Sequence, residues 1–101
     1  MNDRELLEQA AKAAEVDWFR RTDGGMWLKS GGIWNPLTDD GDALRLAVKL
    51  GLHLFQSKHY VRCGRKTIDM PIEESKRDQN PYAATRRAIV RAAAQIGKEM
   101  K

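Results

Sequence analysis

Glycine, proline and asparagine pairs interrupt this chain at short intervals and limit it to short elements of secondary structure. Asp23-Gly24-Gly25 and Gly31-Gly32 are residue types that form tight turns, and Asn35-Pro36 stops the continuation of a paired strand. Gly51 is a natural end for a helix, and Asn80-Pro81 is a strong helix start. The sequence therefore predicts a small domain of mixed helices and strands.

Three segments have the apolar spacing of helices. Residues 2–15 begin with Asn2 and Glu5, a pair that matches a capping box. Residues 38–51 begin with capping side chains and continue as a run that is apolar around most of its circumference, so we expect this helix to be buried against a sheet. A third helix is predicted to begin at Pro81 and end near Gly97. The inner stripe of this last helix is expected to contain Tyr82, Thr85, Ile89, Ala92, Ala93 and Ile96.

Short strands are predicted between the helices. Residues 16–20 and 25–29 would form a hairpin that Ile33-Trp34 extends into a meander, and residues 52–55, 60–63 and 67–70 would form a second meander. Residues 71–79 are polar and charged, and we predict a flexible connection there. The expected fold class is α+β: a small, mainly antiparallel sheet packed with three helices in the order α-ββ-α-βββ-α, as a single-domain sandwich over residues 1–101.

The length and the cysteine content limit the class of protein. A chain of 101 residues has room for one domain with one core. No stretch approaches the roughly 18 apolar residues of a membrane-crossing helix, and the first residues lack the layout of a secretory signal. Cys63 is the only cysteine, so no internal disulfide can form. We therefore expect a cytoplasmic protein with no membrane partner.

Positive charge is concentrated in the second half of the chain. The formal net charge is +4, but residues 1–55 carry seven Lys and Arg against nine Asp and Glu, whereas residues 56–101 carry eleven against five. A basic surface can attract nucleic acid or an acidic partner, or it can be a solvated surface that keeps a small domain soluble. The candidate nucleic-acid contacts on the last helix are Arg86, Arg87, Arg91 and Lys98, and a solvated helix face is their alternative role.

Two clusters of potential metal ligands lack the spacing that a metal site needs. The run Asp39-Asp40-Gly41-Asp42 has adjacent rather than alternating acids and no closing Glu, so we interpret it as a helix cap rather than a calcium loop. His53, His59 and Cys63 lack the closely spaced ligand pairs of a zinc site. His59 and Cys63 would lie roughly 13 Å apart along a strand, too far for a nucleophile and its base. We predict no catalytic residue, metal or cofactor, and a protein that is not an enzyme.

The first predicted meander holds all three tryptophans of the chain. They are Trp18, Trp27 and Trp34, with Arg20, Arg21 and Lys29 interleaved. One hypothesis is that the tryptophans complete a core that has few other bulky side chains. A second is that they form a protein interface, since Trp and Arg dominate binding hot spots. A third is that the rings stack the bases of single-stranded nucleic acid among neighbouring cations.

Two stretches carry a family resemblance. Residues 34–50 begin Trp-Asn-Pro-Leu-Thr-Asp-Asp-Gly-Asp and continue as an apolar helix, and residues 80–94 begin Asn-Pro-Tyr and contain the pattern Arg-x-Ala-x-x-Arg-Ala-Ala. In both respects the chain resembles the NinX-like proteins and related phage α/β/α-sandwich domains, small proteins encoded by tailed phages and prophages. The resemblance implies a phage accessory gene and offers no catalytic residues to carry over.

These observations lead to one functional expectation and one alternative. We expect a non-enzymatic phage or prophage accessory protein that binds a host or phage protein in the host cytoplasm, counter-defence being one form of that role. The candidate protein interface is Trp18, Trp27 and Trp34. The alternative is a small nucleic-acid-binding module that uses the basic C-terminal half. The identity of the partner and the oligomeric state, including a homodimer, stay open.

Overall fold

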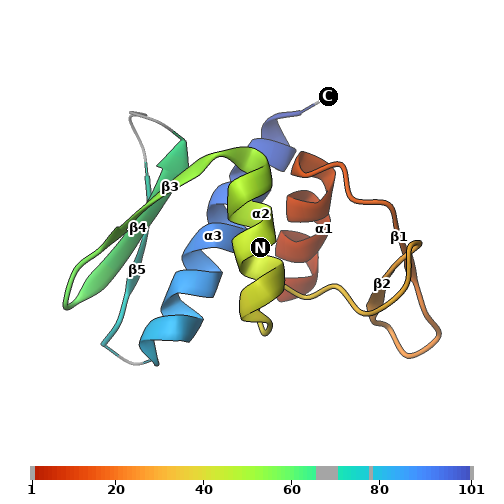
Figure 1. Ribbon diagram of the computed structural model, residues 1–101, viewed down its shortest axis with the longest axis horizontal. Helices are drawn as coiled ribbons and strands as arrows, with labels where there is room; N and C mark the ends of the chain where they lie inside the picture. The colour runs from red at the N-terminus through yellow and green to blue at the C-terminus, as the bar shows by residue number, and fades with distance from the viewer. Residues whose placement is uncertain (1, 66–70, 78, 101) are drawn as a thin grey trace.

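The computed structural model describes residues 2–65, 71–77 and 79–100 and arranges them as a three-stranded sheet, a group of helices and a separate hairpin (Figure 1). The helices are α1 (Asp3–Ala13), α2 (Asp40–Leu50) and α3 (Pro81–Glu99), and the strands are β1 (Trp18–Arg20), β2 (Met26–Leu28), β3 (Leu52–Gln56), β4 (Tyr60–Arg65) and β5 (Ile72–Ser75). The predicted α+β class and element order are confirmed. The strands form two antiparallel sheets, β1-β2 and β3-β4-β5.

Local capping interactions explain where the helices begin and end. The Asn2 side chain accepts a hydrogen bond from the Glu5 backbone N–H, and the Glu5 side chain accepts one from the Asn2 N–H, which completes the predicted capping box. The side chain of Asn80 caps α3 in the same way, with Pro81 at the first helical position. Helix α2 ends at Gly51, whose φ of 62° lies in the left-handed region that glycine adopts without strain.

Helix α3 lies at the centre of the molecule. It packs along α1 on one side and against the β3-β4-β5 sheet on the other, so α1 is separated from that sheet (Figure 1). The contact between α1 and α3 is made largely by small side chains, among them Ala10 and Ala93, both fully buried. Among the described residues, helices cover one face of the three-stranded sheet, and none packs on the other face.

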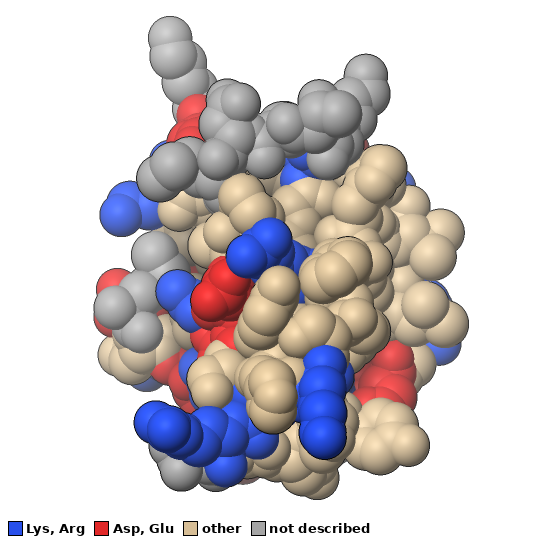
Figure 2. Space-filling model, turned by 90° about the vertical axis from the view of Figure 1, so that its left-hand side faces the viewer, with Lys and Arg blue, Asp and Glu red and all other residues tan. Residues whose placement is uncertain are grey.

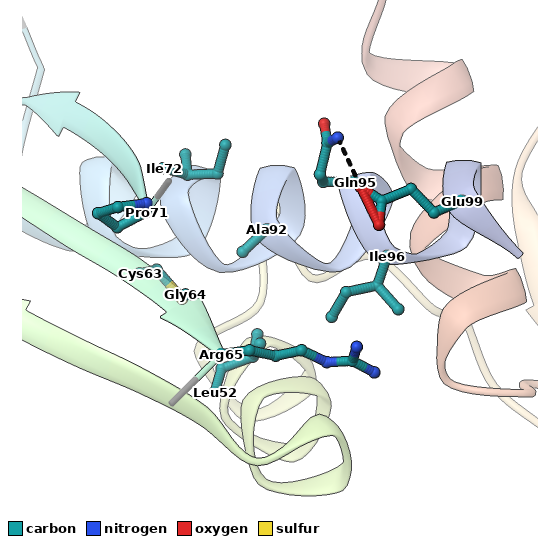
Figure 3. Close-up of a pocket in the computed structure, with 10 residues that line it drawn as sticks. All are labelled: Leu52, Cys63, Gly64, Arg65, Pro71, Ile72, Ala92, Gln95, Ile96 and Glu99. Carbon is teal, nitrogen blue, oxygen red and sulfur yellow. Dashed lines mark hydrogen bonds between the residues drawn. The ribbon is translucent and has the colours of Figure 1, made fainter. Parts of the chain in front are cut away.

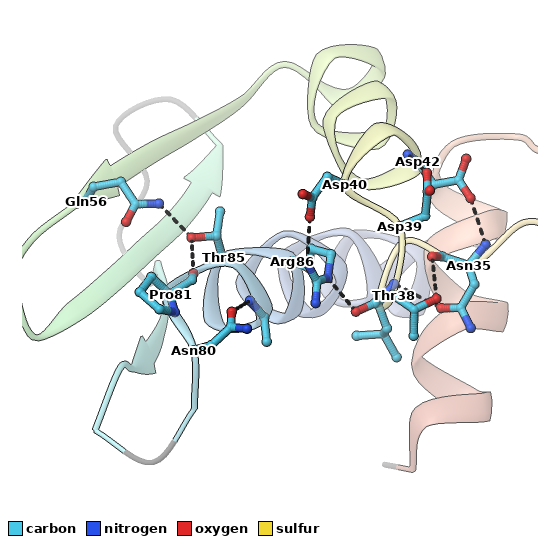
Figure 4. Close-up of polar contacts among 12 residues, drawn as sticks. Asn35, Thr38, Asp39, Asp40, Asp42, Gln56, Asn80, Pro81, Thr85 and Arg86 are labelled. Atoms are coloured by element: carbon cyan, nitrogen blue, oxygen red, sulfur yellow. Dashed lines mark hydrogen bonds and ion pairs between the residues drawn. The ribbon is translucent and has the colours of Figure 1, made fainter.

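The acidic run at residues 39–42 serves the structure. At the start of α2, the Asp39 side chain caps the first turn, and the buried Asp42 carboxylate accepts a hydrogen bond from the Asn35 N–H at 2.9 Å (Figure 4). The Asp42 carboxylate also pairs with Arg45. The Asn35-Pro36 turn is thereby fixed to the helix that follows it. These contacts account for the acidic run at residues 39–42 as a cap and anchor.

The prediction of a flexible connection over residues 71–79 is wrong. Strand β5 (Ile72–Ser75) occupies this segment and pairs antiparallel with β4 in the register Tyr60↔Ser75 and Cys63↔Ile72. The sequence of this segment is typical of a loop because Glu74, which points toward the helices, is charged where a strand usually has an apolar residue. In the structure Glu74 is buried and paired with Arg91 of α3. The strand predicted at residues 67–70 lies outside the described residues.

Two burial predictions are also wrong. Helix α2 is not buried around its circumference: it covers α3 with Ala43, Leu46 and Ala47, while Leu44 and Val48 are 60% and 71% exposed. The reason is that the described elements pack against one side of α2 and leave the side of Leu44 and Val48 exposed (Figure 1). Tyr82, expected on the inner stripe of α3, is 69% exposed. It lies in the first turn of α3.

Candidate binding surfaces

The hairpin β1-β2 has two chemically different faces. Successive residues of a strand point to opposite faces, so Trp18, Met26 and Leu28 share the side that packs against the core. Phe19 and Trp27 are paired across the hairpin and lie on the other side, and Ile33 continues the row through an isolated bridge to Trp27. We call Phe19, Trp27 and Ile33 the meander face. Phe19 is 45% exposed and Ile33 62% exposed, so this row is open to solvent.

The structure divides the three tryptophans between two roles. Trp34 is buried with 6% exposure, and Trp18 is partly buried against the core cluster, so both complete the core. Trp27 is half-buried and lies outside that cluster. Of the three candidate interface residues, the geometry therefore leaves Trp27 as the one that belongs to an outward apolar surface. Phe19 and Ile33 were not among the candidates, although their alternation with Trp18 and Trp34 in the strands was a signal for them.

The indole of Trp27 is held in place by its neighbours. The guanidinium of Arg21 stacks on the ring with its Cζ 4.3 Å from the ring centroid. Its Nε1 lies near the turn, where a Cβ on Gly25 would be in ordinary contact with it at 3.4 Å. The turn itself is fixed, because the Asp23 side chain accepts a hydrogen bond from the Gly25 N–H at 2.8 Å. Trp27 is thus a pre-positioned aromatic side chain at the surface.

Cations flank the meander face. Arg21 and Lys29 fall on the outward side of the hairpin by strand alternation, and both are exposed. Arg20 points to the inner side, where it pairs with Glu8 of α1 and donates a hydrogen bond to the Gly24 carbonyl. Arg20 therefore fastens the hairpin to α1, and the rim of the meander face keeps two positive charges.

Three of the four candidate nucleic-acid contacts on α3 are engaged within the protein. Arg86 is only 18% exposed; it donates to the Leu37 carbonyl at 2.7 Å and pairs with Asp40 at 2.6 Å (Figure 4). Arg87 pairs with Asp3 of α1, and Arg91 pairs with Glu74 of β5. Lys98 is exposed. The arginines of this helix therefore tie α3 to three other segments of the fold, a role that the sequence pattern did not distinguish from a basic binding strip.

A cavity of about 580 Å³ lies between the three-stranded sheet and the C-terminal half of α3 (Figure 3). Its walls are mostly apolar, and polar groups of Arg65, Gln95 and Glu99 stand at one side. Cys63 lines it with 1% exposure, and burial raises the pKa of the Cys63 thiol from 9.0 to about 12. At neutral pH the thiol is therefore fully protonated and a poor nucleophile.

The described residues do not bring the histidines and the cysteine together. Cys63 points to the helix side of its strand, while His53 and His59 are exposed. Within residues 2–65, 71–77 and 79–100 there is no group of three or more His, Cys, Asp or Glu side chains placed to hold a metal ion.

Comparisons with family models, curated proteins and solved structures found no match for this chain. The resemblance to phage proteins therefore stays a prediction. In the part of the chain that the structure describes, no helix has the length and apolar character that crossing a membrane requires.

Proposed function

We propose that this protein acts by binding another protein through the meander face. The observation that carries the proposal is the outward row of Phe19, Trp27 and Ile33 on a hairpin whose other side is fixed to the core. A fold that already buries Trp18 and Trp34 gains nothing in its own core from three further large apolar side chains at the surface. Contiguous apolar surface of this kind is typical of interaction sites.

The composition of the meander face fits a binding hot spot. Tryptophan and arginine are the residues most enriched among side chains that dominate binding energy, and here Arg21 lies directly on Trp27. Because the stacked Arg21 guanidinium already restricts the indole, less side-chain entropy is lost when a partner covers it.

The rim indicates the chemistry of the partner. Arg21 and Lys29 place positive charge beside the apolar row. We expect a partner that offers an apolar pocket for Trp27, with acidic side chains around it, since complementary charges at a rim speed association and set orientation. Together with the resemblance noted above, this extends the proposal to a phage accessory protein that binds a host or phage protein. We propose a binding rather than a catalytic role, because the cysteine is buried and protonated.

A photo-crosslinking amino acid tests this proposal in cells. Benzoylphenylalanine at position 19 replaces an exposed aromatic on the meander face, and the same residue at position 55 replaces an exposed aromatic on the opposite side of the molecule. We expect a discrete, nuclease-resistant protein adduct from position 19 and not from position 55. Identical adducts from both positions, or an adduct from position 55 alone, would contradict the proposal.

A further inference from the structure

The open face of the β3-β4-β5 sheet carries a second surface, independent of the hairpin. Figure 2 looks onto the side of the molecule where this sheet lies. In the register of the sheet, Phe55 is opposite Arg62, and both point away from the helices, as does Tyr60 two residues before Arg62. Val61 and Cys63, which alternate with them, are the buried side. We call Phe55, Tyr60 and Arg62 the sheet face.

The two aromatic rings of the sheet face form one platform. The ring centroids of Phe55 and Tyr60 are 6.2 Å apart with an interplanar angle of 34°, and the Arg62 guanidinium lies 4.8 Å from the Tyr60 centroid. Phe55 is 55% exposed even though Tyr60 on the neighbouring strand β4 lies beside it. The exposed Phe55 ring and the half-buried Tyr60 ring, with the guanidinium stacked on Tyr60, present π surfaces that a nucleobase can cover.

Positive charge adjoins the platform at one end of the sheet. Lys58 lies in the β3–β4 turn, and Lys76 and Arg77 follow the end of β5, which is tied to that turn by hydrogen bonds from the Lys76 N–H to the His59 carbonyl and from Lys76 Nζ to the Ser57 carbonyl. Figure 2 shows Lys and Arg side chains gathered at the lower edge of this face. On the sheet face itself, Arg62 pairs with Glu73 at 3.0 Å, with both side chains about half exposed. Exposed pairs of this kind are easily exchanged for another anion.

From these contacts we infer that the sheet face binds single-stranded nucleic acid, with bases stacked on Phe55 and Tyr60 and the backbone phosphates held by the cations at the end of the sheet. The combination of stacking rings and an adjoining basic edge is what recognition of an unpaired strand needs, because every base has a π face and every linkage a negative charge. The inference does not rest on the meander face, which lies at the other end of the molecule (Figure 1).

Fluorescence polarisation with labelled dT12, U12 and a 12-base-pair DNA duplex tests this inference on the full chain. We expect saturable binding of the single strands and weaker binding of the duplex, because paired bases cannot stack on the platform. Tighter binding of U12 than of dT12 would identify RNA as the preferred strand, and the reverse would identify DNA. For three phosphate contacts, raising the salt from 50 to 200 mM should weaken single-strand binding about 18-fold.

Matched variants separate the platform from general charge. Phe55→Ala should weaken binding at least about fivefold, the lower limit for loss of one stacked base. Phe19→Ala removes another exposed aromatic, on the meander face, and should bind as the wild type does. Lys58→Glu with Arg77→Glu should weaken binding and reduce the salt dependence without removing the rings. The inference is overturned by unchanged binding in Phe55→Ala, by equal losses in Phe55→Ala and Phe19→Ala, or by preference for the duplex. A dimer that Phe55→Ala converts to a monomer would also overturn it, since a second copy would then cover this face.

Discussion

Gly97 of α3 lies against the backbone of Gln9 of α1, so closely that a Cβ on Gly97 would come within 1.9 Å of the Gln9 carbonyl oxygen. No real side chain tolerates such an approach. The backbones of α1 and α3 therefore touch at this point only because residue 97 has no side chain. Together with the fully buried Ala10 and Ala93, this contact explains how a fold with few bulky core residues achieves close packing.

Replacing Gly97 with alanine should destabilise the protein, although the same change usually stabilises a helix. Gly→Ala inside an exposed helix commonly stabilises by about 1 kcal/mol. Here the added methyl group must push α1 and α3 apart, so we expect Gly97→Ala to lower the free energy of unfolding by about 3 kcal/mol. Urea denaturation followed by circular dichroism measures this. Gly41→Ala is the matched control, because a Cβ at position 41 meets only side-chain ends of Asp39 and Arg45. The unfolding free energy of this variant should stay within about 1 kcal/mol of the wild type. Equal effects of the two substitutions would contradict the packing explanation.

The pair between Arg91 and Glu74 should matter more than the neighbouring pair of Arg87. The Glu74 side chain is 11% exposed, whereas Asp3, the partner of Arg87, is 64% exposed. Arg91→Ala leaves the nearly buried Glu74 carboxylate without its cation and should lower the free energy of unfolding by about 2 kcal/mol. This value is smaller than for a fully buried pair because Arg91 itself is partly exposed. Arg87→Ala should cost less than about 0.5 kcal/mol.

A double substitution checks the cause of the Arg91 effect. Arg91→Met combined with Glu74→Leu removes both charges and should recover most of the stability that Arg91→Ala loses. If the double variant is as unstable as Arg91→Ala, the cost comes from lost packing and not from the unpaired Glu74 carboxylate.

Alkaline pH should destabilise the protein through Cys63. Burial raises the pKa of the thiol from 9.0 to about 12, so the unfolded chain loses its thiol proton at lower pH than the folded one. The stabilisation is complete below pH 9 and is lost as the pH rises toward 12. At pH 10.5 the loss should reach about 2 kcal/mol.

Unfolding free energies of wild type and Cys63→Ala, measured at pH 8 and pH 10.5, isolate this contribution. Groups other than Cys63 act in both proteins, so the fall with pH should be larger in the wild type by about 2 kcal/mol. A parallel fall in the two proteins would show that Cys63 is not the titrating group.

The sequence was informative wherever structure depends on neighbouring residues. The starts of α1 and α3 follow from Asn2 and Asn80, whose side chains accept hydrogen bonds from backbone N–H groups of the first turn. The end of α2 follows from Gly51, which adopts the left-handed conformation without strain. Strand β5 could not be predicted in the same way. Its position depends on pairing with β4 and on a distant cation, Arg91, that makes a buried Glu74 tolerable.

The candidate sites show the same division. Composition identified the tryptophan-rich meander. The choice between core and surface depends on which hairpin face meets the core, and the strand register places Trp18 inward and Trp27 outward. From the sequence alone, the arginines of α3 are consistent with a basic binding strip. Their partners, Asp40, Asp3 and Glu74, come from segments remote in the chain, so only the folded structure could show that they are committed.

The most direct test of the central claim is the affinity of Trp27→Ala for the protein that crosslinks to position 19, measured by isothermal titration alongside the free energy of unfolding. Our account predicts at least a 30-fold loss of affinity, corresponding to about 2 kcal/mol. The variant should stay folded, with its unfolding free energy lowered by no more than about 1 kcal/mol, because the indole is only half-buried. Phe55→Ala should bind that protein normally. A Trp27→Ala variant that binds as tightly as the wild type, or one that fails to fold, would contradict the claim that Trp27 anchors a binding surface.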